Sequence, residues 1–130
     1  MTRRFGFADS EVAGVEVQGD TLRVRFAAAN VSEPDTTTFS GERQGHVAGV
    51  VLVCRGGPWP APGEQLIGRL VDGRVVAHGV GLAQLPLPAE LAEASRVELH
   101  FANRARLDIA VTSVSLTVPH DAGLRESFAC

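Results

Sequence analysis

Apolar and polar residues alternate on both sides of a short turn near the start of the chain. Residues 15–17 and 22–26 flank Gly19-Asp20, and the apolar positions in them are Val15, Val17, Leu22, Val24 and Phe26. A repeat of two residues is typical of a β-strand with one buried face, and glycine first in a two-residue loop is typical of a type II′ turn. Pairing Gln18 with Thr21 brings the apolar side chains of both strands to one face. The sequence therefore predicts a β-hairpin here.

Two further regions indicate strands. Residues 47–55 form an apolar run that is rich in β-branched residues and too short for a typical helix, which predicts a central strand covered on both faces. Asp72-Gly73 lies between the stretches 66–71 and 74–80, a pattern typical of a hairpin with a type I′ turn.

The last strong alternation lies in residues 97–101 and 107–111. A two-residue turn between them would place Phe101 opposite Arg106, so we expect a loop of odd length that places Phe101 opposite Leu107. These segments predict another antiparallel strand pair.

The apolar phase changes at two places, and each change predicts a bulge. Val12 is out of phase with Val15, and a bulge at Ala13-Gly14 would return it to the core face. After residue 111 the phase shifts to Val114, which predicts a bulge or a bend at Thr112-Ser113.

Three segments lack this alternation. Residues 32–46 contain Phe39 as their single large apolar residue and are expected to form a long polar loop. Residues 55–65 are rich in proline and glycine around Trp59, which predicts an irregular loop. Residues 83–95 are expected to be a linker with a short helix over 89–94, because that stretch follows a proline.

A chain of 130 residues is long enough for one hydrophobic core, so we expect residues 1–130 to form a single domain. The pattern predicts an all-β fold, an antiparallel β-sandwich of about seven or eight strands with at most one short helix. A small antiparallel β-barrel is the alternative.

Charge and composition exclude several classes of function. The net charge is −3, and all twelve basic side chains are arginines scattered among fifteen carboxylates, so no basic surface for nucleic acid is expected. The apolar run from Val47 to Cys54 is too short to cross a membrane as a helix, and no apolar export signal follows Arg3-Arg4. Two cysteines form no disulfide framework, which favours a reduced, cytoplasmic location.

The histidines and cysteines give only a weak indication of catalysis. The four histidines lie in separate segments without metal-ligand spacing. In an alternative hypothesis the protein is an enzyme on a barrel or cupin-like sandwich, and three of the histidines, His78, His100 and His120, hold a metal or a small ligand. Cys54 lies in an apolar run typical of a buried thiol, and Cys130 ends the chain. We therefore expect no cofactor and favour a protein that is not an enzyme.

The leading hypothesis is a non-catalytic binding or interaction module. Its predicted binding residues are Trp59 and Phe39, two aromatic side chains on loops, and Arg55 at the start of the Trp59 loop. The expected partner is another protein or a second copy of this chain. The remaining alternative is a structural subunit of a homo-oligomer, joined through an edge strand.

Overall fold

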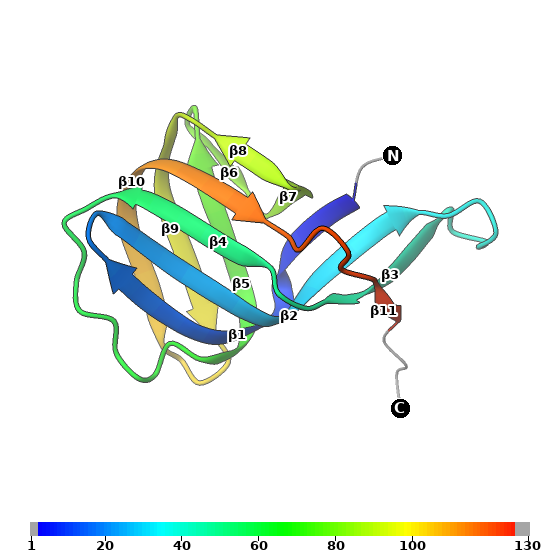
Figure 1. Ribbon diagram of the computed structural model, residues 1–130, viewed down its shortest axis with the longest axis horizontal. Coiled ribbons are helices and arrows are strands. Elements are labelled where there is room, and N and C mark those ends of the chain that lie inside the picture. Colours follow the sequence, from blue (N-terminus) through cyan, green and yellow to red (C-terminus); the bar gives the residue numbers. More distant parts are fainter. Residues whose placement is uncertain (1–2, 127–130) are drawn as a thin grey trace.

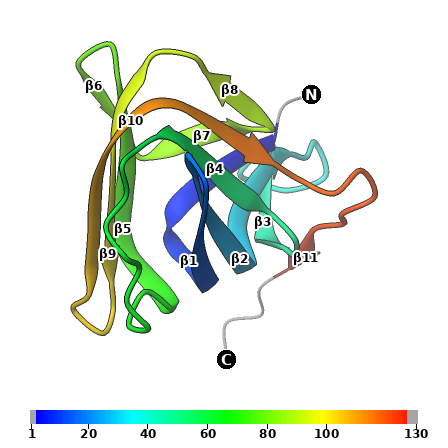
Figure 2. The same ribbon diagram turned by 60° about the vertical axis from the view of Figure 1, so that its left-hand side comes forward.

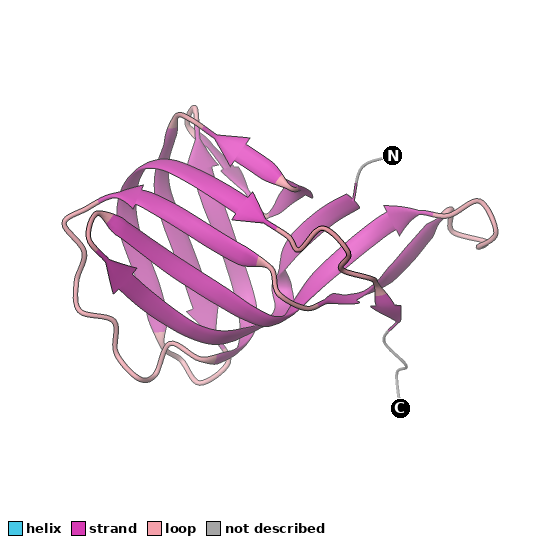
Figure 3. Cartoon of the chain, in the orientation of Figure 1, coloured by secondary structure: helices cyan, strands magenta, loops and turns pink. Residues whose placement is uncertain are grey.

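The computed structural model describes residues 3–126, which form eleven antiparallel strands and no helix (Figures 1 and 3). The strands are β1 (Arg3–Gln18), β2 (Thr21–Pro34), β3 (Glu42–Val47), β4 (Val51–Gly56), β5 (Gly68–Ala77), β6 (Val80–Leu82), β7 (Gln84–Leu87), β8 (Ala89–Leu91), β9 (Ala94–Phe101), β10 (Arg106–Thr117) and β11 (Arg125–Glu126). The predicted all-β antiparallel class is confirmed. The structure has more strands than the seven or eight predicted, because several of them are too short to show an alternating pattern.

Six strands form a closed ring in the order β1, β2, β4, β10, β9 and β5, which gives a barrel-like body (Figures 1 and 2). The ring closes where β5 pairs with β1, with Glu11 opposite Arg69 and Val12 opposite Gly68. Side chains on the inner face of each ring strand meet in one continuous apolar core. We call this body the barrel.

The same sheet extends beyond the barrel because β1 and β2 are longer than the ring requires. The first residues of β1 pair with β7, the last residues of β2 pair with β3, and β3 pairs with β11. Residues 29–47, which we call the arm, project away from the barrel in Figure 1. The pairing of β1 with β2 shifts between Gly6 and Glu11, where Asp9 has a φ of 67°, and this irregularity lies where the sheet passes out of the barrel.

The predicted first hairpin is confirmed in register and turn. Gln18 pairs with Thr21. Gly19 has a positive φ of 62° and the φ of Asp20 is not positive, as a type II′ turn requires. The predicted bulge is also present, because the register shifts between Val12 and Gly14. It leaves the Val12 side chain buried against the core.

The predicted loop over residues 32–46 is wrong for most of its length. Residues 32–34 belong to β2 and 42–46 belong to β3, so only 35–41 form the loop. The strands form there because β2 and β3 pair with each other, and their polar side chains conceal this from an apolar pattern.

The predicted turn at Asp72-Gly73 is also wrong. β5 runs through it, and the hairpin turn lies at His78-Gly79, with φ values of 52° and 75° that fit a type I′ turn. Gly73 serves a different purpose, because a Cβ atom there would lie 2.9 Å from the Phe7 Cβ. The glycine lets a phenylalanine ring pack against the strand.

Two smaller expectations need correction. The predicted helix within 83–95 is absent from the described chain, and β7, β8 and the start of β9 occupy that segment. The predicted continuous strand over 47–55 is interrupted after β3, because Gly49 has a φ of 84° and turns the chain before β4 begins. β4 does lie centrally, between β2 and β10.

The hairpin of β9 and β10 has an odd-length loop, as expected. Phe101 N donates to Ala105 O at 2.9 Å, which leaves residues 102–104 as the loop, and Arg104 has a φ of 73°. Leu107 therefore lies opposite Leu99. The predicted pairing of Leu107 with Phe101 is wrong by two residues. The predicted bulge near Thr112-Ser113 is confirmed by a register shift between Val111 and Ser113.

Candidate functional site

The barrel wall has a gap beside the first half of β10. β10 pairs with β9 from Arg106 to Ala110, but its pairing with β4 begins only at Val111, opposite Gly56. β4 ends there because Gly56 and Gly57 have φ values of 133° and 86°, a backbone conformation that turns the chain away from the sheet. Within residues 3–126, no strand pairs with the side of Arg106–Ala110 that faces away from β9. We call this side the open edge.

The register shows which backbone groups face the open edge. The Phe101–Ala105 pair is hydrogen-bonded, and in an antiparallel ladder such pairs alternate with pairs that do not exchange hydrogen bonds. Leu107 and Ile109 therefore direct their N–H and C=O groups toward β9. Arg106 and Asp108 direct theirs toward the open edge.

A loop that does not pair with β10 covers this gap. Residues 57–67 leave β4 and return to the start of β5 beside the β9–β10 hairpin (Figures 1 and 2). Within residues 3–126, no backbone hydrogen bond joins this loop to 106–110. Pro60 and Pro62 have no N–H group to donate.

The loop and the open edge enclose a pocket of about 410 Å³, which we call the mouth pocket. It is lined by Leu22, Pro60, Ala61, Pro62, Gly63, Gln65, Leu66, Ala105, Arg106, Leu107 and Asp108. Three of these, Leu22, Leu66 and Leu107, are buried side chains of the core and give the pocket an apolar floor. The volume is within the range of small-ligand sites, and the mouth of a barrel is a common place for them.

Two hydrogen bonds hold the loop and the start of β5 beside the hairpin. Asn103 Nδ2 donates to Gln65 O at 2.8 Å, and Ala102 N donates to Arg69 O at 2.8 Å. The loop is therefore attached to the β9–β10 turn at one end of the pocket, while the prolines form its opposite wall.

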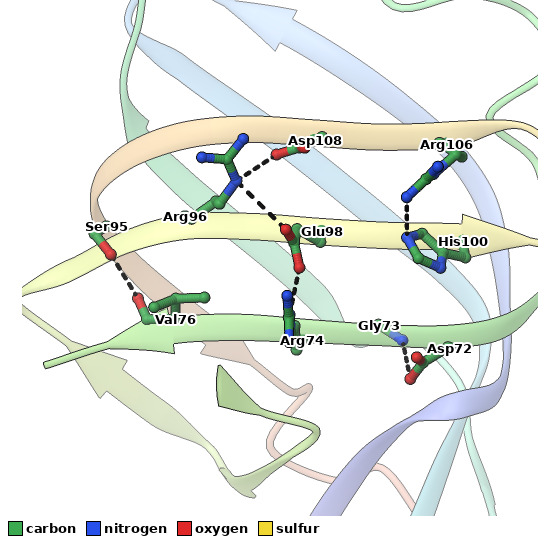
Figure 4. A network of polar contacts seen from close by, with 10 residues as sticks. All are labelled: Asp72, Gly73, Arg74, Val76, Ser95, Arg96, Glu98, His100, Arg106 and Asp108. Atoms are coloured by element: carbon green, nitrogen blue, oxygen red, sulfur yellow. Dashed lines mark hydrogen bonds and ion pairs between the residues drawn. The ribbon is translucent and has the colours of Figure 1, made fainter. Parts of the chain in front are cut away.

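The outer surface of β5, β9 and β10 carries a network of charges that reaches the pocket (Figure 4). Arg96 Nε lies 2.6 Å from Asp108 Oδ1 and 3.4 Å from Glu98 Oε1, and Arg74 also binds Glu98. The hydrogen bond from Arg96 lowers the pKa of the Asp108 carboxyl group. Asp108 is thus an ionised carboxylate whose charge is already compensated.

Arg106 differs from the other arginines of this network. Its Nη2 lies 3.1 Å from His100 Nε2, and because a guanidinium group can only donate, that ring nitrogen accepts. Among the described residues, no carboxylate lies within ion-pair distance of Arg106. It therefore retains donors at the rim of the mouth pocket.

The structure does not gather the three predicted binding residues around one pocket. Trp59 is half-buried against the core and packs on Gly57, where a Cβ atom would lie 3.4 Å from Trp59 Nε1. It belongs to the loop over the mouth pocket but does not line it. Phe39 is fully exposed in the loop at the tip of the arm.

Arg55 lies on β4 and takes part in a polar chain between strands. Its Nη1 donates to Ser115 Oγ at 2.8 Å, and that hydroxyl donates to Glu90 Oε2 at 2.9 Å. Ser115 is buried beneath these two charged side chains. These two hydrogen bonds connect β4 and β8 to β10.

The histidines of the enzyme hypothesis are not brought to one centre. His78 is in the β5–β6 turn, 3.2 Å from Glu93 Oε2, His100 is on β9 and His120 is in a turn after β10. In the part of the chain that the structure describes, no three His, Cys, Asp or Glu side chains form a group that could hold a metal.

The thiol of Cys54 is not available for chemistry. The side chain is fully buried, and this burial raises its pKa to about 12, so it stays protonated at neutral pH. Cys130 lies outside the described residues.

Sequence reasoning missed the mouth pocket. The alternation of residues 107–111 does place Leu107 inward and Arg106 outward. The prolines at 60 and 62 indicate a loop that cannot pair. What the sequence could not supply is that this loop passes beside β10, because that depends on the order of strands in the ring.

Comparisons with protein-family models, with curated proteins and with solved structures find no match for this chain. None of the described residues belongs to a helix long and apolar enough to span a membrane.

Proposed function

We propose that this domain is a non-catalytic binding module and that its ligand site is the mouth pocket. One observation carries the proposal: the open edge leaves the backbone groups of Arg106 and Asp108 without a strand partner beside an apolar floor. Backbone groups that are unpaired next to a pocket are ready to bind a ligand that supplies donors and acceptors.

The chemistry of the pocket favours binding over catalysis. Leucine, proline and alanine residues form most of its walls, and Arg106 supplies a permanent positive charge at the rim. Such a site holds a ligand through apolar contact, backbone hydrogen bonds and one charge.

The test is a nuclear magnetic resonance screen of small molecules and short peptides against the labelled chain. Binding is expected to shift the signals of Leu22, Leu66 and Leu107. Ala105→Trp fills the pocket and should abolish these shifts, whereas Ala102→Trp, on the exposed face of the same turn, should preserve them. No binder in the screen, or binding that persists in Ala105→Trp, would contradict the proposal.

A second candidate, assembly into a homo-oligomer, has its own supporting observation at the tip of the arm. Phe39 is fully exposed there, at the end of a projecting hairpin, and aromatic side chains are enriched in protein interfaces. Light scattering is expected to give a multiple of the chain mass that falls to one chain in Phe39→Ser. A wild-type mass of one chain would contradict this candidate.

We also place the protein in a reduced compartment, the cytoplasm. The support is that Cys54 is a free, buried thiol. Cell fractionation with an antibody to the chain tests this, and recovery from an oxidising compartment would contradict it.

A further inference from the structure

We infer that the ligand of the mouth pocket is an extended peptide segment of a partner protein, which pairs with the open edge of β10 as an added strand. This inference rests on the proposed binding function and names the class of ligand. The added strand would occupy the position that β4 leaves at Gly56, and it would run antiparallel to β10 as β4 does.

The backbone of the open edge has the periodicity of a strand. Arg106 and Asp108 each present one N–H and one C=O group toward the gap, and the two residues are about 7 Å apart along the strand. An extended peptide presents its own backbone groups at the same interval. A peptide strand can therefore pair with both residues.

The arrangement of the pocket walls also favours a strand. Four consecutive residues, 105–108, line the pocket and the last three belong to β10, so it runs along the strand and is not a hole at a single position. The opposite wall contains Pro60 and Pro62, which cannot donate hydrogen bonds. The strand partner that the structure offers to the occupant is therefore β10.

Side chains of the pocket define which peptide fits. Successive residues of a strand point to opposite faces, so an apolar peptide residue would contact Leu22, Leu66 and Leu107 on the inner face. Its neighbour would point outward beside Arg106, which forms no ion pair among the described residues. We therefore expect an acidic residue next to an apolar one.

The experiment starts from a phage-displayed library of random short peptides, selected on the immobilised full chain. The strongest binder is then synthesised in two forms, with N-methyl groups on one or the other alternate set of backbone amides. One form blocks the amides that face β10, and the other blocks only amides that face away. The first is expected to weaken binding by about tenfold or more, and the second by less than about twofold.

Arg106→Gln is expected to weaken an acidic binder by about two- to fivefold. The matched control is Arg104→Gln, an exposed residue of the same hairpin that does not line the pocket, and it should bind as the wild type does. Amide exchange of Arg106 and Asp108 should slow when the peptide is bound.

Two outcomes would overturn the inference. The first is a selection that enriches no peptide, and the second is a binder that loses affinity equally in both methylated forms. If small molecules still shift Leu66 and Leu107 while peptides fail, the peptide inference is wrong and the proposed binding site stands. If neither class binds there, both are wrong.

Discussion

The barrel and the arm are both antiparallel sheet, but they are stabilised in different ways. The barrel buries leucine, valine and phenylalanine side chains in one core. The arm buries only a few apolar residues near its base, such as Val31 and Val47, and its outer part depends on polar contacts. Arg3 and Arg43 both bind the Glu33 carboxylate, and Thr37 N and Oγ1 both donate to Asp35 Oδ1.

This difference shows what strand pairing requires. Apolar alternation identifies a strand that covers a core, whereas a strand that projects beyond the core needs only a neighbour for its backbone. The same condition explains the open edge, where β10 continues past the end of β4 and its backbone lacks a neighbour.

The sharpest contrast between the two regions is expected from two phenylalanines. Phe5 lies where the arm meets the barrel and packs edge-to-face against Phe7 and Phe26, with centroid distances of 4.9 and 5.2 Å. Phe5→Ala should lower the free energy of unfolding by about 3–5 kcal/mol. Phe39→Ala at the arm tip should change it by less than about 0.5 kcal/mol. Chemical denaturation measures both, and similar values would contradict the contrast.

Alkaline pH should destabilise the barrel through Cys54. Burial raises the pKa of this thiol from 9.0 to about 12, so between these values the unfolded chain has lost a proton that the folded chain retains. Stability is therefore unaffected below pH 9 and falls as pH rises, by a total approaching about 4 kcal/mol near pH 12. The chain contains no lysine or tyrosine to obscure this range.

Denaturation of the wild type and of Cys54→Ala across this pH range isolates the thiol. The variant should lose the alkaline decline, because the residue that titrates is gone. Parallel pH profiles for the two proteins would show that Cys54 is not the cause.

Packing density in the barrel is tested by two glycines on its strands. An added Cβ at Gly73 would lie 2.9 Å from the Phe7 Cβ, which is held in the core, so Gly73→Ala should cost about 1–3 kcal/mol. An added Cβ at Gly14 would lie 2.8 Å from Arg25 Nη2, the end of a flexible side chain that can move. Gly14→Ala should therefore be nearly neutral, and equal effects in thermal unfolding would contradict this interpretation.

The smallest effect is expected at the tip of the arm. The Thr37 hydroxyl and amide lower the pKa of Asp35, so its stabilising contribution is present above pH 3.8 and is lost as pH falls through the lower folded-state value. Asp35→Ala should speed amide exchange at Thr37 and leave the unfolding midpoint of the barrel unchanged. A lower midpoint would show that the arm and the barrel are more tightly coupled.

The sequence predicts the elements of the barrel better than those of the arm. The first hairpin, the bulges near Ala13 and Thr112, and the central position of β4 follow from apolar phase and turn chemistry. The strand within residues 42–47 does not, because Arg43, Gln44 and His46 are polar, and β3 forms through its pairing with β2. The turn predicted at Asp72-Gly73 is wrong because the sequence does not distinguish a glycine required for packing from a glycine required for a turn.

The candidate site was less predictable than the fold for a related reason. Trp59 indicated the correct loop, but the residues that line the mouth pocket come from β2, that loop and β10. Their proximity depends on the closure of the ring and on where β4 ends. Neither property is local in the sequence.

Amide hydrogen exchange along one strand tests the open edge most directly. In the free protein, the amides of Leu107 and Ile109 donate to β9 and should exchange orders of magnitude more slowly than those of Arg106 and Asp108. This alternation is the expected result, because neighbouring residues share the same strand and their amides point to opposite sides of it. Equal protection of all four amides would show that the gap beside β10 is already filled, and β10 would have no open edge.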